Sequence, residues 1–337
     1  MSLPHRSKPI DMTGRRIFVT GGTGFLGRSL LDYLLEAESI YDEMPQVTLL
    51  SRSPEQFLIR FPEYAGRPWL RIIQGDLGHL PKVEPGTYTD IIHGAADTHS
   101  SAKPLEWLDQ LVQGTRNILD FAVASNAQRV LLVSSGASYG TVPKGIEQLC
   151  ENLPFAPHTN DVQSVYAQGK RLAEHLCALY AQQYNIACVV ARCFALLSEH
   201  MPLNGPYAAG NFIRDVLAGK DIEIHGDGSA IRTYLYGRDA AHWLLSLLSV
   251  GESGEIYNVG SNFPVSILEL AQLISQLSAN TCQINVMKSA PHTNRAMYVP
   301  SIEKAATLGL GVETTLTQAI INIFEYHSKN TSLKLIN

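Results

Sequence analysis

The sequence predicts an α/β fold, a Rossmann-type doubly wound parallel sheet with a smaller C-terminal substrate-binding lobe. Short apolar segments of strand type alternate with longer segments whose apolar residues recur at helical spacing. The first strand-type segment ends at paired glycines, and after about residue 193 proline- and glycine-containing loops separate shorter helices. We therefore expect a nucleotide-binding domain with the catalytic residues at 14–192, a lobe at 193–327 with some exchange of segments, and a ligand cleft between them.

The expected strands of the first domain are short, apolar and rich in β-branched residues, as buried parallel strands are. They cover residues 16–20, 47–50, 70–73, 91–93, 130–133 and 187–191. Helical spacing predicts helices from Phe25 to about Leu35 and over 105–125 and 165–184, then over about 211–218, 239–250 and 266–278. Helices between parallel strands must cover both faces of the sheet.

Composition and charge exclude several classes of function. The 337 residues carry a net charge of −5 without a basic cluster, which argues against a nucleic-acid partner. No apolar stretch approaches the roughly 20 residues of a membrane helix, and the polar N-terminus has no signal-peptide core. The five cysteines have no metal-ligand spacing, so we expect no metal site and a reducing, cytoplasmic compartment.

The first expected strand runs into a glycine-rich turn. Gly21, Gly24 and Gly27 have the spacing GxxGxxG, with Phe25 and Leu26 between the last two. Glycine permits a tight turn, close approach of backbone to a pyrophosphate, and a helix packed near its strand. The helix N-terminus then faces the phosphates. Between the first strand and first helix of an alternating α/β chain, this turn predicts a dinucleotide site.

The end of the second expected strand favours one form of the dinucleotide. An acidic side chain there suits the ribose of NAD, whereas an arginine accommodates the 2′-phosphate of NADP. This strand ends in Ser51 and Arg52, without an acid. A solvated surface arginine is the alternative interpretation. We expect NADP or NAD, with NADP favoured.

Three side chains predict acid–base chemistry. Tyr166 and Lys170 lie four residues apart at the start of a helix, on one face. The lysine ammonium would lower a tyrosine pKa that starts near ~10, so that Tyr166 acts as acid or base near neutral pH. Ser135, at a strand end, could donate a hydrogen bond to a reacting carbonyl or alkoxide. The alternatives are an ordinary amphipathic helix and a serine that caps backbone groups.

These motifs occur together in a known order. Together they make the chain resemble the extended short-chain dehydrogenases/reductases. The segments that carry the resemblance are 20–27 (TGGTGFLG), 93–96 (HGAA), 133–140 (VSSGASYG), the Tyr166/Lys170 pair and Gly226–Arg232. That family contains nucleotide-sugar epimerases, 4,6-dehydratases and ketoreductases. The resemblance covers roughly residues 14 to 325.

The resemblance implies roles for individual residues. Asp76 and Leu77 would contact the adenine, and Ala95 and Ala96 would line the dinucleotide. Ser135, Tyr166 and Lys170 would be catalytic, and Lys170 would also bind the nicotinamide ribose. The expected substrate-binding residues, with arginines that clamp a diphosphate, are Asn211, Arg232 and Arg295.

Three positions depart from the family pattern. Leu111 and Ala195 stand where many members have asparagine, so a bound water and a usual sugar contact are in doubt. Gly136 and Ala137 follow Ser135, where 4,6-dehydratases have Asp-Glu for proton transfer. Neither residue can move a proton, so we argue against a dehydratase.

We therefore expect an enzyme that transfers a hydride to or from carbon C4 of a nucleotide-linked sugar. It is a 4-epimerase if bound NAD is recycled, or a 4-ketoreductase of a nucleotide-6-deoxy-4-ketosugar if NADPH is consumed. A reductase of a non-sugar carbonyl remains open, and a non-catalytic dinucleotide-binding regulator is disfavoured because both Tyr166 and Lys170 are present. We also expect a homodimer through the helices at 105–125 and 165–184, and a packing role for Trp107.

Overall fold

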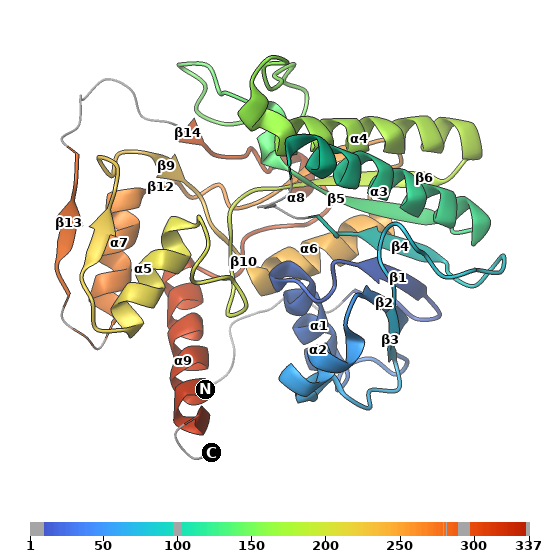
Figure 1. The fold of residues 1–337 in the computed structure, drawn as a ribbon, viewed down its shortest axis with the longest axis horizontal. Helices are drawn as coiled ribbons and strands as arrows, with labels where there is room; N and C mark the ends of the chain where they lie inside the picture. The colour runs from blue at the N-terminus through green and yellow to red at the C-terminus, as the bar shows by residue number, and fades with distance from the viewer. Residues whose placement is uncertain (1–9, 97–102, 279, 281, 289–296, 335–337) are drawn as a thin grey trace.

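A computed structural model describes residues 10–96, 103–278, 280, 282–288 and 297–334. Its centre is a seven-stranded sheet in which every pair of neighbouring strands is parallel (Figure 1). The strand order is β11 (Ile256–Val259), β6 (Ala187–Cys193), β5 (Arg129–Ser135), β4 (Asp90–His93), β1 (Arg16–Thr20), β2 (Gln46–Ser51) and β3 (Leu70–Gln74). This confirms the predicted doubly wound parallel sheet.

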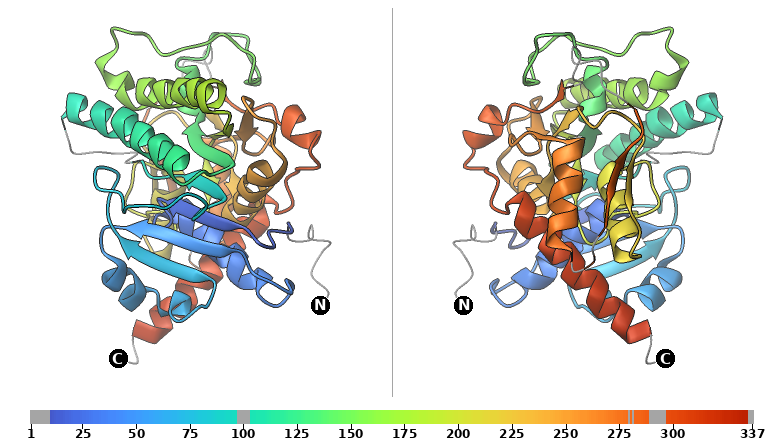
Figure 2. Two further views of the ribbon diagram at one scale, coloured as in Figure 1. Left: turned by 90° about the vertical axis from the view of Figure 1, so that its right-hand side faces the viewer. Right: turned by 90° about the vertical axis from the view of Figure 1, so that its left-hand side faces the viewer.

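Helices cover both faces of this sheet (Figure 2). On one face, α3 (Pro104–Ala124) and α4 (Val165–Tyr184) bury an apolar stripe that includes Ile118, Leu119 and Cys177. On the other, α1 (Phe25–Ala37) and α6 (Gly237–Val250) pack together and bury Leu31 and Trp243. The short helices α2 (Pro54–Arg60) and η1 (Pro62–Tyr64) lie beside β3.

A smaller lobe has its own core, built from α5 (Ala208–Leu217), α7 (Ile267–Leu277) and α9 (Leu316–Lys334). The pair β8 (Ile222–Ile224) and β13 (Ile284–Val286) covers these helices. Two further small sheets lie closer to the main one. They are β7 (Leu196–Leu197) with β10 (Leu235–Tyr236), and β12 (Val265–Ser266), β9 (Ile231–Arg232) and β14 (Met297–Tyr298).

The chain crosses between the two units more than once. Both α6 and β11 come from beyond residue 193, yet α6 packs on α1 and β11 pairs with β6. The helix α8 (Glu303–Ala306) also packs on β11. A single boundary at 192/193 therefore does not separate the two cores.

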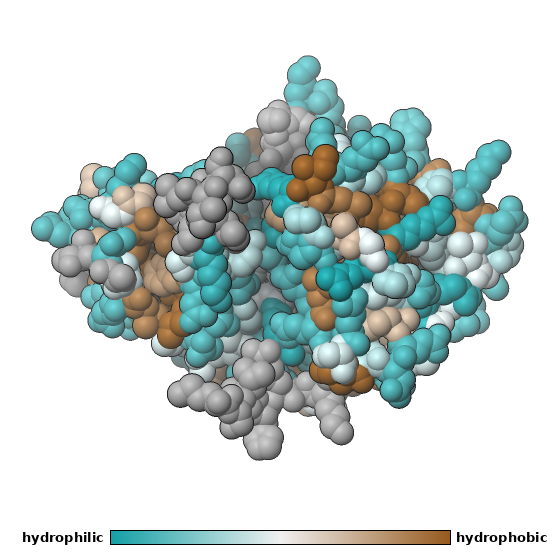
Figure 3. All heavy atoms as spheres, turned by 90° about the horizontal axis from the view of Figure 1, so that it is seen from below, coloured by the Kyte–Doolittle hydropathy of each residue, from teal (hydrophilic) through white to brown (hydrophobic). Residues whose placement is uncertain are grey.

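The surface in Figure 3 is mostly hydrophilic, with hydrophobic side chains in separate patches. None of the helices in the described parts of the chain is long and apolar enough to cross a membrane.

A buried ion pair joins three elements behind the carboxyl edge of the sheet. The side chains of Glu174 on α4 and Arg192 on β6 are 7% and 6% exposed, and Arg192 Nη2 lies 2.7 Å from Glu174 Oε2. Arg192 Nε donates to Glu174 Oε1 over 3.0 Å, and the Ser134 and Ser138 hydroxyls donate to the same oxygen. Each charge thus has a partner, which a buried charge requires.

Glu174→Gln should destabilise the fold strongly, because it leaves the Arg192 charge buried without its counter-charge. We expect a loss of about 3–5 kcal/mol in the free energy of unfolding, measured by urea titration. The control is Glu43→Gln at an exposed position, which should change stability by less than about 0.5 kcal/mol. Equal losses in the two variants would show that the pair does not stabilise the fold.

Candidate active site

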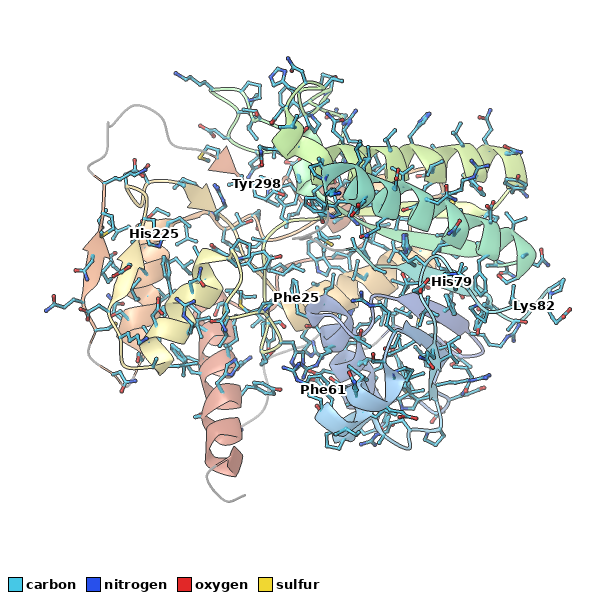
Figure 4. All side chains as sticks on the ribbon, in the orientation of Figure 1. Phe25, Phe61, His79, Lys82, His225 and Tyr298 are labelled. Carbon is cyan, nitrogen blue, oxygen red and sulfur yellow. The ribbon has the colours of Figure 1, made fainter. Side chains whose placement is uncertain are left out.

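A cavity of about 1330 Å³ lies between the carboxyl edge of the sheet and the smaller lobe. Both units line it, and Phe25, one of the lining residues, lies between them in Figure 4. The cavity brings together most of the residues expected from the sequence to form the site: Gly21, Gly24, Phe25, Leu26, Gly27, Ser51, Arg52, Asp76, Leu77, Ala95, Ala96, Ser135, Tyr166, Lys170 and Arg232.

The glycine turn joins β1 to α1 at one wall of this cavity. Gly21 has a φ of +75°, and a Cβ there would lie 2.5 Å from the carbonyl carbon of Gly94. A Cβ on Gly27 would lie 2.4 Å from the Gly21 carbonyl oxygen, so α1 packs against the turn more closely than a side chain at position 27 would allow. Gly24 precedes the first residue of α1, whose N-terminus opens into the cavity. This wall fits the pyrophosphate of a dinucleotide.

The ends of β2 and β3 form the next part of the cavity. Ser51 is buried, whereas Arg52 is exposed and borders the cavity. Asp76 accepts hydrogen bonds of 2.8 Å from the backbone N–H groups of Gly78 and His79, and these bonds, first that of Gly78, lower its pKa. The Leu77 carbonyl accepts from the Asn117 side chain over 2.7 Å. These contacts fix the strand ends where an adenosine would lie.

The segment after β4 is held by a buried histidine. His93 lies between Thr20, 2.8 Å from its Nδ1, and Thr115, 3.2 Å from its Nε2. Burial lowers the pKa of His93 to about 3, so the ring is neutral. The Thr20 hydroxyl accepts from the Ala95 N–H over 3.2 Å. His93 therefore has a structural role, because through Thr20 it orients Ala95 at the cavity wall.

Tyr166 and Lys170 project from the first turns of α4 beside Ser135. The Lys170 ammonium donates to the Val133 carbonyl over 2.7 Å and lies 5.8 Å from the centre of the Tyr166 ring. Burial lowers the pKa of Lys170 to about 8. Burial also raises the pKa of Tyr166, and hydrogen bonding with Ser135 opposes this rise. The pKa of Tyr166 is therefore raised and not lowered as expected from the sequence, because burial outweighs the hydrogen bonding with Ser135.

Sequence reasoning missed two aromatic residues of the cavity. Trp107, expected to be a packing group, stacks on Tyr166 with ring centres 5.9 Å apart and planes at 26°. The sequence signal that could have indicated this role was the position of Trp107 in the first turn of the helix that follows β4. Tyr298, on β14, packs on Phe194 with ring centres 4.6 Å apart. The sequence indicated Tyr298 only weakly, because nothing but its closeness to Arg295 suggested that it lies near the substrate.

The expected substrate-binding residues have three different placements. Arg232 on β9 lines the cavity, and its guanidinium lies 5.8 Å from the centre of the Tyr298 ring. Asn211 is not among the residues that line the cavity, since its side chain turns to Arg214, whose Nη1 donates to it over 2.9 Å. Arg295 lies outside the described residues.

The departures from the family pattern have visible packing consequences. Leu111 is buried, and its Cδ1 would lie 2.5 Å from a Cβ on Gly169, so an apolar contact between α3 and α4 occupies this position. Ala195 lines the cavity and offers no side-chain hydrogen bond. Within the described ranges, no group of three or more His, Cys, Asp or Glu side chains could hold a metal ion.

A family model described as the NAD dependent epimerase/dehydratase family matches residues 17–260. The chain belongs to this family. Among its curated relatives, UDP-glucuronic acid decarboxylase 1 of Danio rerio is 29% identical, with 94% of this chain and 73% of the relative covered. The dTDP-D-glucose 4,6-dehydratase of Mus musculus is 27% identical, with 98% and 93% covered. The family resemblance expected from the motifs is therefore confirmed.

Solved structures share the family's fold. A UDP-N-acetylglucosamine 4-epimerase from Methanobrevibacter ruminantium M1, in complex with UDP-N-acetylmuramic acid, has a TM-score of 0.80 at 21% identity, covering 94% of this chain and 100% of its own. A dTDP-glucose 4,6-dehydratase from Bacillus anthracis, in complex with NAD, has a TM-score of 0.78 at 21% identity, covering 94% and 97%. The glycine turn, the small residues Ala95 and Ala96 and the volume of the cavity fit the dinucleotide that the family implies.

Dinucleotide affinity should fall as the pH rises through about 8, because the buried Lys170 ammonium loses its proton there. Below this pH the charged form can donate hydrogen bonds to a ribose, and above it that donor charge is lost. The measurement is the dissociation constant of the oxidised dinucleotide between pH 6.5 and 9.5. Lys170→Ala should bind more weakly and without this dependence. The same dependence in the variant would assign it to another group.

Proposed function

We propose that this family member is an NAD(P)-dependent enzyme that transfers a hydride between the dinucleotide and carbon C4 of a nucleotide-linked sugar. One observation carries the proposal: Ser135, Tyr166 and Lys170 share a single cavity with the glycine turn on one side and Arg232 on the other. The turn would hold the dinucleotide, and Arg232 would clamp the diphosphate of the sugar nucleotide. The reacting carbon would then lie between them, beside Tyr166.

The bound dinucleotide supplies the hydride acceptor or donor. Tyr166 takes the proton from the sugar hydroxyl during oxidation and returns it during reduction, with Ser135 donating a hydrogen bond to the reacting oxygen. The protonated Tyr166 phenol, which burial favours, is the form that gives its proton to a carbonyl oxygen in the reductive step. Trp107 covers Tyr166 and limits the access of water to it.

A 4-epimerase is the principal form of this proposal, and a 4-ketoreductase is the second candidate. Exposed Arg52 beside Ser51, without an acid at the end of β2, favours NADP and hence net reduction. Water elimination is disfavoured, because Gly136 and Ala137 offer no proton-transfer group after Ser135.

The deciding experiment incubates the protein with UDP- and dTDP-linked hexoses and 4-ketohexoses in the presence of each dinucleotide. Mass spectrometry and NMR then identify the products. An epimer of unchanged mass supports the first candidate, and a product two hydrogens heavier supports the second. Loss of one water would contradict the proposal.

Tyr166→Phe should reduce turnover by ~10²-fold or more while dinucleotide affinity stays nearly unchanged, since only the proton-transfer group is lost. Ser135→Ala should reduce turnover less, because it removes one hydrogen-bond donor. Lys170→Ala should reduce both turnover and dinucleotide affinity. Steady-state kinetics and separate binding titrations measure these effects. A Tyr166→Phe enzyme that keeps more than about a tenth of turnover would remove Tyr166 from the mechanism.

The dinucleotide site should prefer NADP(H) over NAD(H), and Arg52→Ala should remove this preference. The physical reason is the loss of the guanidinium that would pair with the 2′-phosphate. We expect NADP affinity to fall about tenfold in the variant with NAD affinity unchanged. The measurement is fluorescence titration with both oxidised forms. Tighter NAD binding in the wild-type protein would refute the assignment.

We further propose a homodimer through α3 and α4. Of the apolar residues expected at this interface, Leu111, Ile118, Leu119 and Tyr180 are buried within the protomer, and Leu108, Val112 and Leu176 are partly buried. Leu105, Leu172 and Leu179 stay 76%, 46% and 44% exposed. Light scattering at micromolar concentration should give a dimer mass for the wild type and a monomer mass for Leu172→Glu/Leu179→Glu. A wild-type monomer would exclude this interface.

A further inference from the structure

The helix α1 presents one face to the smaller lobe. Phe25, Arg28, Ser29 and Asp32 are spaced i, i+3, i+4 and i+7 along it, which places them on a single side of the helix. The same helix begins at the glycine turn, so its N-terminus borders the dinucleotide cavity. One element thus reaches from the expected pyrophosphate site to the second unit.

Phe25, the first residue of α1, packs against both apolar cores. It contacts the core that α1 shares with α6 and also the core of the smaller lobe. Its ring lies edge-on to that of Tyr207, with ring centres 6.4 Å apart and planes at 61°. Tyr207 directly precedes α5, and its carbonyl accepts from the Asn211 N–H over 3.1 Å. Phe25 therefore connects the start of α1 to the start of α5, and Figure 4 shows it where the two units meet.

Arg28, one turn further along, reaches α9. Its side chain is buried, its Nη2 donates to the Tyr326 hydroxyl over 3.3 Å, and its guanidinium lies 3.5 Å from the centre of the Phe61 ring. Tyr326 also lies edge-on to His200, with ring centres 5.5 Å apart, and His200 pairs through Nε2 with Asp32. The face of α1 is thus joined to α9 directly by Arg28 and indirectly by Asp32.

The middle of this face is closely packed. Ser29 Oγ donates to the Phe25 carbonyl over 3.1 Å. A Cβ on Gly237, the first residue of α6, would lie 2.4 Å from Ser29 Oγ and 2.6 Å from the Cβ of Ser198. Such packing does not absorb a displacement, so a shift in the first turns of α1 moves the segments that contact it.

The first turn of α1 depends on a ligand for its cap. Gly24, which precedes the helix, has no side chain that could cap it. The first N–H groups of a helix have no partner within the helix. The pyrophosphate of a dinucleotide would accept hydrogen bonds from these groups and fix the turn that carries Phe25 and Arg28. Both contacts with the smaller lobe therefore start from residues that the ligand would order.

We propose that α1 couples dinucleotide binding to the order of the smaller lobe, with Phe25 and Arg28 as positioning residues that hold α5 and α9. Binding at the N-terminus of α1 fixes its first turn, and the contacts with Tyr207 and Tyr326 extend this ordering to the two helices. The lobe that carries Arg232 is then ordered before a second ligand binds, so that ligand loses less conformational entropy. For the identity of the second ligand, the inference rests on the proposed function.

Hydrogen exchange of the backbone amides measures this ordering without any turnover. The ligand is ADP-ribose or its 2′-phosphate, whichever binds more tightly, because both have the pyrophosphate but no nicotinamide. The main readout is α9, whose described residues are not among those that line the cavity. Exchange in α5 and α9 should slow at least about fivefold on binding, the lower end of common coupling factors. Exchange in the pair of β8 and β13, in the same lobe, should change less.

Three matched variants assign the effect to the contacts of α1. Tyr326→Leu removes the group that accepts from Arg28, so protection of α9 should fall while that of α5 remains. Tyr207→Leu removes the ring beside Phe25 and should have the opposite result. Tyr234→Leu changes another tyrosine of the smaller lobe, between β9 and β10, and should leave both effects intact.

Arg28→Met tests the contact with α9 from the other side and leaves α9 itself unchanged. It should reduce the protection of α9 as Tyr326→Leu does. Full protection of α9 in Arg28→Met and Tyr326→Leu, or an equal slowing of exchange over the whole protein, would overturn the proposal.

The affinity for a nucleoside diphosphate tests the same coupling with a second ligand. ADP-ribose should raise the affinity for UDP or dTDP about tenfold, measured by calorimetry. These ligands lack the nicotinamide and the sugar, the two groups that would meet at the reacting carbon. Phe25→Leu and Tyr207→Leu should each reduce this factor, and the double variant should reduce it no further, because both remove one contact.

The two measurements separate this inference from the proposed function. If neither UDP nor dTDP binds but ADP-ribose still protects α5 and α9 through Tyr207 and Tyr326, then the coupling role of α1 stands and the proposed substrate is wrong. If nucleotide sugars are turned over and exchange in α9 does not change on binding, then the proposed function stands and α1 does not couple the two units.

Discussion

The geometry of the site depends on the buried pair of Glu174 and Arg192. Glu174 lies one helical turn after Lys170 and two turns after Tyr166, and it accepts hydrogen bonds from Ser134 and Ser138 on either side of Ser135. Arg192 holds the same carboxylate from β6 with two hydrogen bonds. Two charges that are buried away from water must pair with each other. This pairing leaves α4 little freedom in how it lies against β5 and β6. The distance between Tyr166 and Ser135 is set by this constraint.

Much of the nucleotide-binding unit could be predicted because its information is local. A short apolar run, a glycine turn and a helical stripe each lie within a few residues, so β1 to β6 and the turn at Gly21–Gly27 follow from pattern alone. The strand β11 could not be predicted from the pattern, because its Asn258 is polar yet fully buried and interrupts the apolar run. That asparagine is satisfied by Leu149, Ser301 and Tyr139, all distant in sequence, and no local pattern encodes such partners.

The site shows the same division between local and distant information. Residues placed by motif spacing reach the cavity, whereas Asn211 does not line it and accepts a hydrogen bond from Arg214, three residues later in the same helix. The i, i+4 spacing of Tyr166 and Lys170 gives their shared face but not their burial, and burial decides both pKa values. Trp107 and Tyr298 are far apart in the sequence. Only the folded arrangement of α3 and β14 shows that both line the cavity.

The late position of β11 has a consequence for biosynthesis. When the ribosome has made the chain only as far as β6, that strand is an open sheet edge, and α1 lacks the helix α6 that covers its apolar side. Unpaired edges and uncovered apolar helices favour association with other chains. The nucleotide-binding unit can close only after residue 259 has emerged, by which time α5 and β8 of the smaller lobe have been synthesised but α7, β13 and α9 have not. Segments of the two units thus alternate along the chain, so neither unit can be completed before part of the other has been made.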